Sequence, residues 1–294
     1  VGVQLDENDN VKESLDELEE LADTAGAQTV GKIIQNRETV HPGTYIGKGK
    51  IDEVKALLYG TDAIGIVCDD ELSPAQMGNL SDALDTKVMD RTLIILDIFA
   101  KRAFTREGKI QVELAQLKYR ASKLTGQGKA LSRLGGGIGT RGPGEKKLEM
   151  DRRLIRTRIS RLKAELRDVV KHREVQRKQR QKNHLPVVCI VGYTNAGKST
   201  LLNHFTNAGV YEEDQLFATL DPTTKSLDLS GGQTILMTDT VGFIRKLPHH
   251  LVEAFKSTLE EAKYSDLILH VVDASNPQKE KQMEAVYETL KQLG

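Results

Sequence analysis

The sequence contains no tryptophan, only two cysteines and no long apolar run. Two cysteines are too few for a disulfide framework or a cysteine-ligated metal cluster. Cys68 and Cys189 both lie in apolar, strand-like runs, so we expect two buried free thiols. No apolar stretch approaches the roughly 20 residues that a membrane-spanning helix needs, and no signal peptide opens the chain. Nothing in the sequence therefore points to secretion, and two buried thiols suit a reducing compartment.

A net charge is also lacking, because 42 basic and 42 acidic residues balance. The charges are unevenly spread: residues 101–182 hold 25 Lys and Arg but only 8 Asp and Glu, an excess of +17. An ordinary solvated helix surface interleaves both signs, so this bias favours a polyanionic partner such as RNA. The basic residues that we expect to contact RNA are Arg133, Arg141, Lys146, Lys147, Arg152, Arg153 and Arg156.

Residues 1–104 alternate strand-like and helix-like segments, which is typical of an α/β domain with a parallel sheet. Leu15, Leu18 and Leu21 recur at helical spacing, and Ser73–Pro74 is a helix start with proline at the first helical position. The predicted strands cover residues 1–5, 28–34, 63–68 and 87–90, and the predicted helices cover 11–21, 49–58, a segment from residue 73, and 92–103.

Residues 105–183 are predicted to form a basic antiparallel helical hairpin. Apolar residues share one face of a first helix over residues 106–126, which we expect to break at the glycines of 125–128. A long helix is predicted over residues 148–182. Between the two helices, the glycine-rich stretch 134–145 should form a loop at the tip, because it cannot bury a core.

Residues 184–294 carry a phosphate-binding loop. An apolar run at 186–191 leads into Gly-Tyr-Thr-Asn-Ala-Gly-Lys-Ser at 192–199, and a helical segment follows. In this strand–helix context the pattern G-x-x-x-x-G-K-[ST] favours a triphosphate site over an unliganded glycine turn. Backbone N–H groups and the helix dipole attract phosphate, Lys198 can reach the β- and γ-phosphates, and the Ser199 hydroxyl can bind Mg²⁺.

A second predicted strand, at 235–239, ends in Asp239-Thr-Val-Gly242, and further segments predict a strand at 267–273 and a helix at 279–293. An aspartate at this place can hold Mg²⁺, usually through water, and Gly242 can offer its N–H to a γ-phosphate. One hydroxyl from the loop at 217–224 should complete the Mg²⁺ shell. We expect it to be Thr219, with Thr223 and Thr224 as the alternatives.

Residues 192–199, 217–221 and 239–243 together resemble the translation-factor class of P-loop GTPases. The tract Gly-Thr-Arg-Gly-Pro-Gly-Glu at 139–145, the N-terminal α/β unit and the basic hairpin narrow this resemblance to the HflX family of GTPases, over essentially the whole chain. The resemblance implies three parts: an N-terminal α/β domain (1–104), the hairpin (105–183) and a P-loop GTPase domain (184–294).

The resemblance further implies GTP hydrolysis with Mg²⁺, binding to rRNA of the large ribosomal subunit, and the splitting or rescue of stalled ribosomes under stress. It also implies a cytoplasmic location, with peripheral association at the membrane left open. We expect Lys198, Thr219 and Gly242 to act in catalysis, Ser199, Thr219 and Asp239 to hold the metal, and the protein to be a monomer. The expected nucleotide-binding residues are Gly192, Tyr193, Thr194, Asn195, Ala196, Gly197, Lys198, Ser199, Thr200, Phe217, Ala218, Thr219, Leu220, Asp221, Asp239, Thr240, Val241 and Gly242.

Two features depart from a standard GTPase. Phe243 stands where GTPases that orient water with a side chain place glutamine, so intrinsic hydrolysis should be slow. The resemblance to HflX proteins implies that the ribosome stimulates it. No Asn-Lys-x-Asp motif is present, so the residues indicate a Mg²⁺–nucleoside triphosphate site and only the resemblance makes the base guanine. We expect the GTPase domain to be incomplete at its C-terminal end.

Two other functions fit the sequence less well. An ATP-driven RNA or rRNA remodelling factor that uses the N-terminal domain would rest on Lys48, Lys50, Asp69 and Asp70, without a second phosphate loop. A passive RNA-binding module with a vestigial nucleotide site conflicts with the intact Lys198, Ser199, Thr219 and Asp239.

Overall fold

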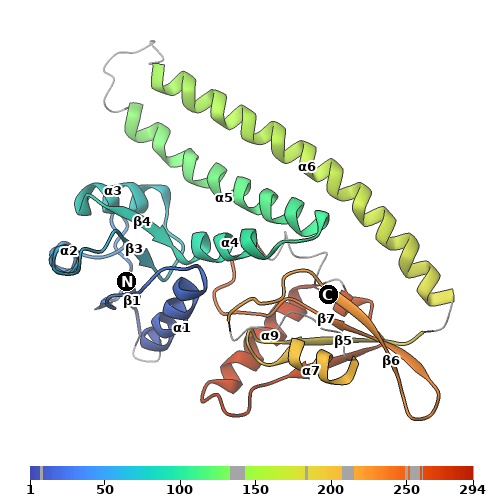
Figure 1. Ribbon diagram of the computed structural model, residues 1–294. Coiled ribbons are helices and arrows are strands. Elements are labelled where there is room, and N and C mark those ends of the chain that lie inside the picture. Colours follow the sequence, from blue (N-terminus) through green and yellow to red (C-terminus); the bar gives the residue numbers. More distant parts are fainter. Residues whose placement is uncertain are drawn as a thin grey trace. The chain divides into compact units, whose positions relative to one another are not determined.

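The computed structural model describes residues 1–6, 9–132, 143–182, 185–206, 215–248, 251, 259 and 261–293, with the backbone alone at 125–132, 143–148, 172, 174, 176–182 and 293. The chain divides into two compact units (Figure 1). The first unit comprises residues 1–97 and 116–160, and the second comprises 98–115 and 161–294. In the described part of the chain, no helix combines the length and the apolar character needed to cross a bilayer.

The first unit contains an α/β arrangement of short parallel strands. Strand β1 pairs with β2 and strand β3 pairs with β4, both in parallel, and the Asp69 amide donates to the Val1 carbonyl (2.9 Å), which brings β1 beside β3. The elements are β1 (Gly2–Gln4), α1 (Val11–Thr24), β2 (Ile34–Asn36), α2 (Lys48–Thr61), β3 (Gly65–Cys68), α3 (Pro74–Leu84), β4 (Lys87–Asp90) and α4 (Arg91–Arg102). The predicted parallel α/β fold is confirmed.

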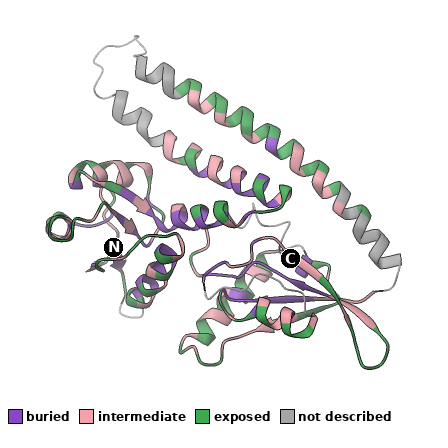
Figure 2. Cartoon of the chain, viewed as in Figure 1, coloured by how far each residue is buried: buried purple, intermediate pink, exposed green. Residues whose placement is uncertain are grey.

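Local sequence explains most of these elements. Helix α1 turns Leu15, Leu18 and Leu21 inward, as their spacing predicts. Helix α3 begins with a capping box, in which the Ser73 hydroxyl accepts from the Gln76 amide and the Gln76 side chain accepts from the Ser73 amide. Figure 2 shows that buried residues follow the strands and the inner faces of the helices.

The prediction of a strand at 28–34 is wrong, because β2 begins at Ile34, the residue that pairs with Gly2. Residues 28–33 have an apolar pattern but no strand ladder. A pattern alone does not make a strand, since each strand needs a hydrogen-bonding partner.

Helices α5 (Arg106–Ser132) and α6 (Pro143–Lys182) run side by side and antiparallel (Figure 1). In the first unit the Arg152 guanidinium donates to the Leu124 carbonyl (2.8 Å), and in the second unit Arg173 forms an ion pair with Glu107. The predicted break at 125–128 is wrong, because α5 continues through these glycines to Ser132. Glycine within a helix costs only about 1 kcal/mol relative to alanine and keeps its N–H, so it need not end the helix. Helix α6 starts at Pro143, five residues earlier than predicted, and residues 133–142 of the glycine tract lie outside the described residues.

The second unit contains a four-stranded sheet in the order β6-β7-β5-β8. Strand β5 is parallel to β7 and to β8, and β6 is antiparallel to β7. The elements are β5 (Val187–Gly192), α7 (Lys198–Thr206), β6 (Thr223–Asp228), β7 (Thr234–Asp239), β8 (Leu267–Val271) and α9 (Lys279–Leu293). Strand β6 is not predicted from the sequence. Because β5 and β7 are parallel neighbours, the loops that follow them meet at one edge of the sheet.

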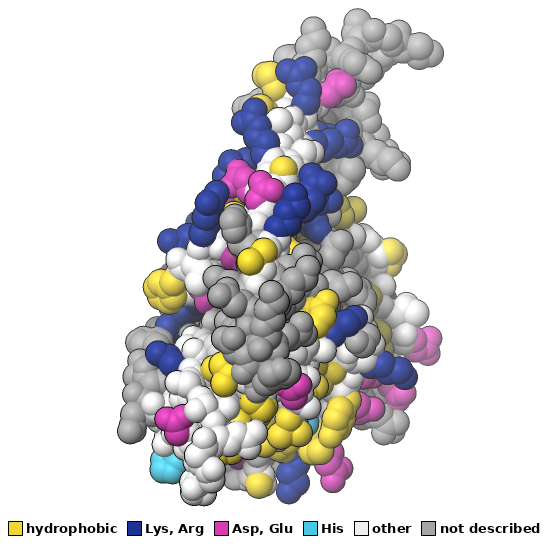
Figure 3. Space-filling model, turned by 90° about the vertical axis from the view of Figure 1, so that its right-hand side faces the viewer, with side chains coloured by type: hydrophobic (Ala, Val, Ile, Leu, Met, Phe, Trp, Pro, Cys, Tyr) yellow, Lys and Arg dark blue, Asp and Glu magenta, His cyan; other side chains and the backbone are white. Residues whose placement is uncertain are grey.

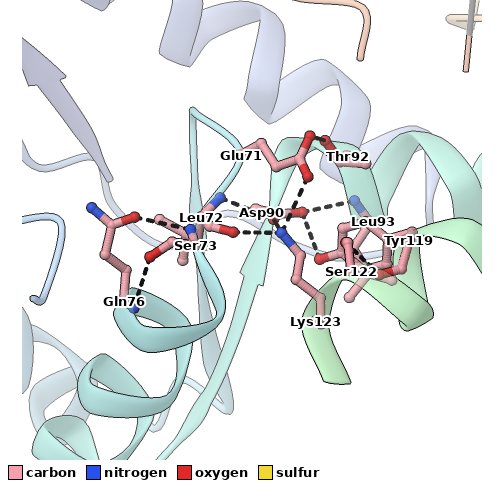
Figure 4. Close-up of polar contacts among 10 residues, drawn as sticks. All are labelled: Glu71, Leu72, Ser73, Gln76, Asp90, Thr92, Leu93, Tyr119, Ser122 and Lys123. Carbon is pink, nitrogen blue, oxygen red and sulfur yellow. Dashed lines mark hydrogen bonds and ion pairs between the residues drawn. The ribbon is translucent and has the colours of Figure 1, made fainter. Parts of the chain in front are cut away.

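Asp90, at the end of β4, fastens helix α5 to the first unit (Figure 4). Its buried carboxylate accepts from the Leu93 amide (3.0 Å), the Leu72 amide (3.2 Å) and the Tyr119 hydroxyl (2.9 Å), and it pairs with Lys123 (3.3 Å). Burial, followed by the charge of Asp90, raises the pKa of Tyr119, so this hydroxyl stays a donor.

Replacing Asp90 by alanine should therefore lower the free energy of unfolding by about 3–5 kcal/mol, because the Leu72 and Leu93 amides and the Tyr119 hydroxyl all lose a buried acceptor. Lys123 loses its buried carboxylate as well, although it keeps Glu71 and the Leu72 carbonyl as partners. Tyr119→Phe removes a single hydrogen bond and should cost about 1 kcal/mol. Denaturant unfolding of both variants checks the ranking. If Asp90→Ala were as stable as Tyr119→Phe, the proposal that Asp90 holds helix α5 in place would be wrong.

Candidate nucleotide-binding site

A cavity of about 310 Å³ lies at the edge of the sheet where β5 and β7 end. It is lined by residues 194–200, 215, 217–219 and 242, which come from the loop after β5, the segment before β6 and the loop after β7. Three loops distant in sequence thus form one site, as parallel strand order requires.

Lys198 is buried at the start of α7, with its ammonium donating to the Tyr193 carbonyl (2.7 Å). Burial lowers the pKa of Lys198 to about 8, although the charge of Asp239 acts in the opposite direction. A buried ammonium with so little compensation favours a bound anion. A triphosphate in the cavity would supply that charge.

Ser199, Thr219 and Asp239 converge in the structure. The Ser199 hydroxyl lies 2.7 Å from Asp239 Oδ2 and 2.8 Å from the Thr219 hydroxyl, and Thr219 donates to the same carboxylate oxygen (3.1 Å). The alternatives Thr223 and Thr224 lie instead on β6, where the Thr224 hydroxyl contacts that of Thr238 (2.9 Å). Thr223 pairs with Asp239 across the β6–β7 ladder, but the hydroxyl that contacts both Ser199 and the Asp239 carboxylate is that of Thr219.

The Ser199–Thr219–Asp239 group fits a hard divalent cation. Two hydroxyls and one carboxylate are oxygen donors of the kind that Mg²⁺ binds, together with phosphate oxygens and water. Burial raises the pKa of Asp239, opposed mainly by the Ser199 hydrogen bond and the Lys198 charge, and its Oδ1 is buried without a side-chain partner among the described residues. A cation beside this carboxylate would favour its ionised form. The described residues hold no cluster of three or more His, Cys, Asp or Glu side chains.

Gly242 and Phe243 bring the loop after β7 against the phosphate loop. The Thr194 amide donates to the Phe243 carbonyl (2.7 Å), and the Phe243 amide donates to the Gly192 carbonyl (3.1 Å). A Cβ atom at Gly242 would lie 2.6 Å from Thr194 Cα, so this close approach requires glycine. The Phe243 side chain is buried and does not line the cavity.

Several predicted nucleotide-binding residues lie near the cavity but direct their side chains elsewhere. The Thr240 hydroxyl donates to the Ile190 carbonyl, Leu220 and Val241 are buried, and the Tyr193 hydroxyl accepts from the Arg245 amide. Asp221 faces the start of α5. Gln215 also lines the cavity but is not among the predicted residues; its only signal in the sequence is its place two residues before Phe217.

The predicted RNA-contact residues differ in exposure. Arg153 and Arg156 are exposed on α6, and Lys and Arg side chains gather along this part of the molecule in Figure 3. Arg152, by contrast, is half-buried, and its guanidinium donates to the Leu124 carbonyl. Arg133 and Arg141 lie outside the described residues, as do the side chains of Lys146 and Lys147.

The two cysteines agree with their predicted state. Cys68 and Cys189 are free and buried, and burial raises the pKa of each thiol to about 12. Neither thiol is therefore ionised near neutral pH, and neither is a candidate for the site.

Three family profiles match consecutive parts of the chain. They are described as GTP-binding GTPase N-terminal (residues 12–100), GTP-binding GTPase Middle Region (102–180) and 50S ribosome-binding GTPase (187–293).

Curated relatives match the chain along its whole length. GTPase HflX of Lacrimispora saccharolytica is 72% identical over 294 residues, covering 100% of this chain and 70% of the relative. GTPase HflX of Caldanaerobacter subterraneus is 57% identical, covering 96% of this chain and 66% of the relative. GTPase HflX of Escherichia coli K12 is 49% identical, covering 97% and 67%. The chain thus spans about two thirds of the length of these relatives.

Solved structures also match. A GTP-binding protein from Sulfolobus solfataricus in complex with GDP is 25% identical, with a TM-score of 0.50, over 100% of this chain and 77% of that one. A structure of SsGBP with GDP is 26% identical, with a TM-score of 0.55 and the same coverage.

Triphosphate binding should become coupled to proton uptake above about pH 8. The ammonium is the form that binds phosphate, and its population in the free protein falls as the pH rises through the Lys198 pKa of about 8. Calorimetry in buffers of different ionisation enthalpy should detect little uptake at about pH 7 and close to one proton at about pH 9. Lys198→Arg keeps its charge and should take up none. Absence of uptake by the wild-type protein would remove Lys198 from the phosphate site.

Thr219→Val should weaken Mg²⁺-dependent triphosphate binding about tenfold, because it removes one oxygen from the Ser199–Thr219–Asp239 group while keeping the side-chain shape. Thr224→Val is the matched control, since its hydroxyl contacts Thr238 alone. Titration of a fluorescent non-hydrolysable GTP analogue with and without Mg²⁺ measures both. Equal losses in the two variants would contradict the assignment of Thr219.

Proposed function

The chain belongs to the HflX family of GTPases, and we propose that it is a slow GTP hydrolase that binds rRNA of the large ribosomal subunit through its basic hairpin and splits or rescues stalled ribosomes. The observation that carries this proposal is the combination of a complete phosphate and cation site with a +17 helical segment in one chain. The family profile over residues 187–293 supports the ribosomal partner.

In the proposed hydrolysis, different residues of the site bind the phosphates and the metal ion. Lys198 would hold the β- and γ-phosphates, and the Gly242 amide would donate to the γ-phosphate. Ser199, Thr219 and Asp239 would hold Mg²⁺, which neutralises charge that develops on the phosphate oxygens. In this proposal Lys198, Thr219 and Gly242 are the groups that touch the reacting phosphate or its metal.

The burial of Phe243 supports slow intrinsic turnover. Its ring lies inside the protein and carries no hydrogen-bonding group, so it cannot orient a water molecule. A group supplied by a partner can accelerate GTP hydrolysis by about 10³–10⁵. The proposed partner is the large subunit, so bound GTP would persist until the protein reaches it.

The charge of the hairpin supports an rRNA contact. Arg153 and Arg156 are exposed on α6. Binding to RNA through such residues releases counterions, so affinity for the large subunit should fall steeply as salt rises. We further propose that the protein acts as a monomer in the cytoplasm.

Addition of purified large subunits should raise GTP turnover by at least about a hundredfold, whereas small subunits should have no effect. The double variant Arg153→Glu/Arg156→Glu should bind large subunits more weakly but keep its affinity for GTP. Arg152 is left unchanged because it supports the hairpin. Lys225→Glu/Lys279→Glu, on exposed positions of the GTPase unit, is the charge-matched control. Turnover that large subunits leave unchanged would refute the proposed activation.

A further inference from the structure

Residues 215–221, which contain Thr219, contact the connection between helices α4 and α5. We call residues 99–108 the α4–α5 elbow; these residues and segment 215–221 belong to the second unit. The Arg102 guanidinium donates to Gln215 Oε1 (2.6 Å). The Phe99 and Phe217 rings pack edge to face, with centroids 4.7 Å apart. The elbow therefore holds the segment on the amino-terminal side of Thr219.

Asp221 holds the same segment on the carboxyl-terminal side of Thr219. Its Oδ2 accepts from the amides of Phe104 and Thr105 (both 2.8 Å), and its Oδ1 accepts from the Thr105 hydroxyl (2.5 Å). The Thr105 hydroxyl in turn accepts from the Gly108 amide (2.9 Å), which caps α5. A carboxylate from a loop far along the chain thus satisfies donors at the start of a 27-residue helix, where the helix dipole also favours negative charge.

Gly108 leaves the space that Asp221 occupies. A Cβ atom at this position would lie 2.2 Å from Asp221 Oδ1 and 3.2 Å from the Thr105 hydroxyl. The first turn of α5 therefore accepts the carboxylate only because residue 108 has no side chain.

Phe217 has a backbone conformation that its own residue type disfavours. Its φ is +56°, a left-handed conformation that is uncommon for a bulky residue, and its side chain is buried. The Thr194 hydroxyl of the phosphate loop accepts from the Phe217 amide (2.7 Å). Backbone strain of this kind persists only where surrounding contacts enforce it, and here those contacts come from the elbow and the phosphate loop.

We propose that Asp221 is a positioning residue for GTP hydrolysis: by capping α5 it holds Thr219 beside Ser199 and Asp239. The proposal rests on the proposed function in one respect, namely that Thr219 binds the Mg²⁺ of a bound triphosphate. Because coupling between two sites is reciprocal, Mg²⁺–GTP in turn stabilises the first turn of α5. GDP lacks the γ-phosphate and engages the phosphate loop without Thr219, so it exerts little of this effect.

Asp221→Ala should lower the affinity for a non-hydrolysable GTP analogue with Mg²⁺ about tenfold and leave GDP affinity within about twofold. Thr105→Val, which removes only the hydroxyl contact, should show a smaller loss with the same selectivity. Asp228→Ala is the matched control, since that carboxylate accepts from Thr234 on the neighbouring strand and should change neither affinity. If Asp221→Ala lost affinity for both nucleotides equally, the role of Asp221 would be merely structural. If it kept its affinity for both, Asp221 would have no role in binding. Both results overturn the proposal.

A double-mutant cycle tests the contact itself. Gly108→Ala should reproduce the selective loss of GTP-analogue affinity, because its methyl group displaces the Asp221 carboxylate. In the Asp221→Ala background the same substitution should have no further effect. Additive losses would mean that the two residues act independently, which contradicts the proposal.

Hydrogen exchange provides the reciprocal measurement on the protein alone. Amides 106–110 should exchange more slowly with the Mg²⁺–GTP analogue than with GDP, and this difference should vanish in Asp221→Ala. If the wild-type protein binds no GTP, the proposed function itself fails. If it binds GTP without these differences, only the positioning role of Asp221 fails.

Discussion

The candidate site is built around two buried opposite charges at the carboxyl edge of the β6-β7-β5-β8 sheet. Burial lowers the pKa of Lys198 and raises that of Asp239, so the protein surroundings disfavour the charged form of both groups. Phosphate and a divalent cation are the ligands that would favour the charged forms again. The parallel pairing of β5 with β7 brings these two residues together, and residues 215–221 complete the site by adding Thr219.

Helix α5 meets a carboxylate at two places along its length. In the second unit Asp221 accepts hydrogen bonds at its start, and in the first unit Asp90 accepts from Tyr119 and pairs with Lys123. The Asp221 contact lies within the second unit, and the Asp90 contact lies within the first.

Most of the fold could be predicted because periodicity and capping are local. The spacing of Leu15, Leu18 and Leu21 and the Ser73–Pro74 start signal predicted helices that the structure contains. Predictions failed where the secondary structure of a segment depends on a partner that is distant in the sequence. Strand β2 forms only where β1 pairs with it, strand β6 depends on β7, and the glycines of α5 are tolerated in a helix that packs along α6. The burial of apolar residues on α6 likewise depends on which face packs against α5: Leu154 is exposed and Ile155 is half-buried.

The sequence by itself determined the phosphate loop, the Asp239–Gly242 motif and the basic hairpin, because each depends on spacing within a few residues or on composition. Only the tertiary structure decided that the hydroxyl in contact with both Ser199 and the Asp239 carboxylate is that of Thr219 and not that of Thr223 or Thr224. It also turned Arg152 inward, buried Phe243 and joined Asp221 to Thr105, 116 residues away. These choices depend on which chain segments pack together, and a contact across more than a hundred residues leaves no periodic signal in either segment.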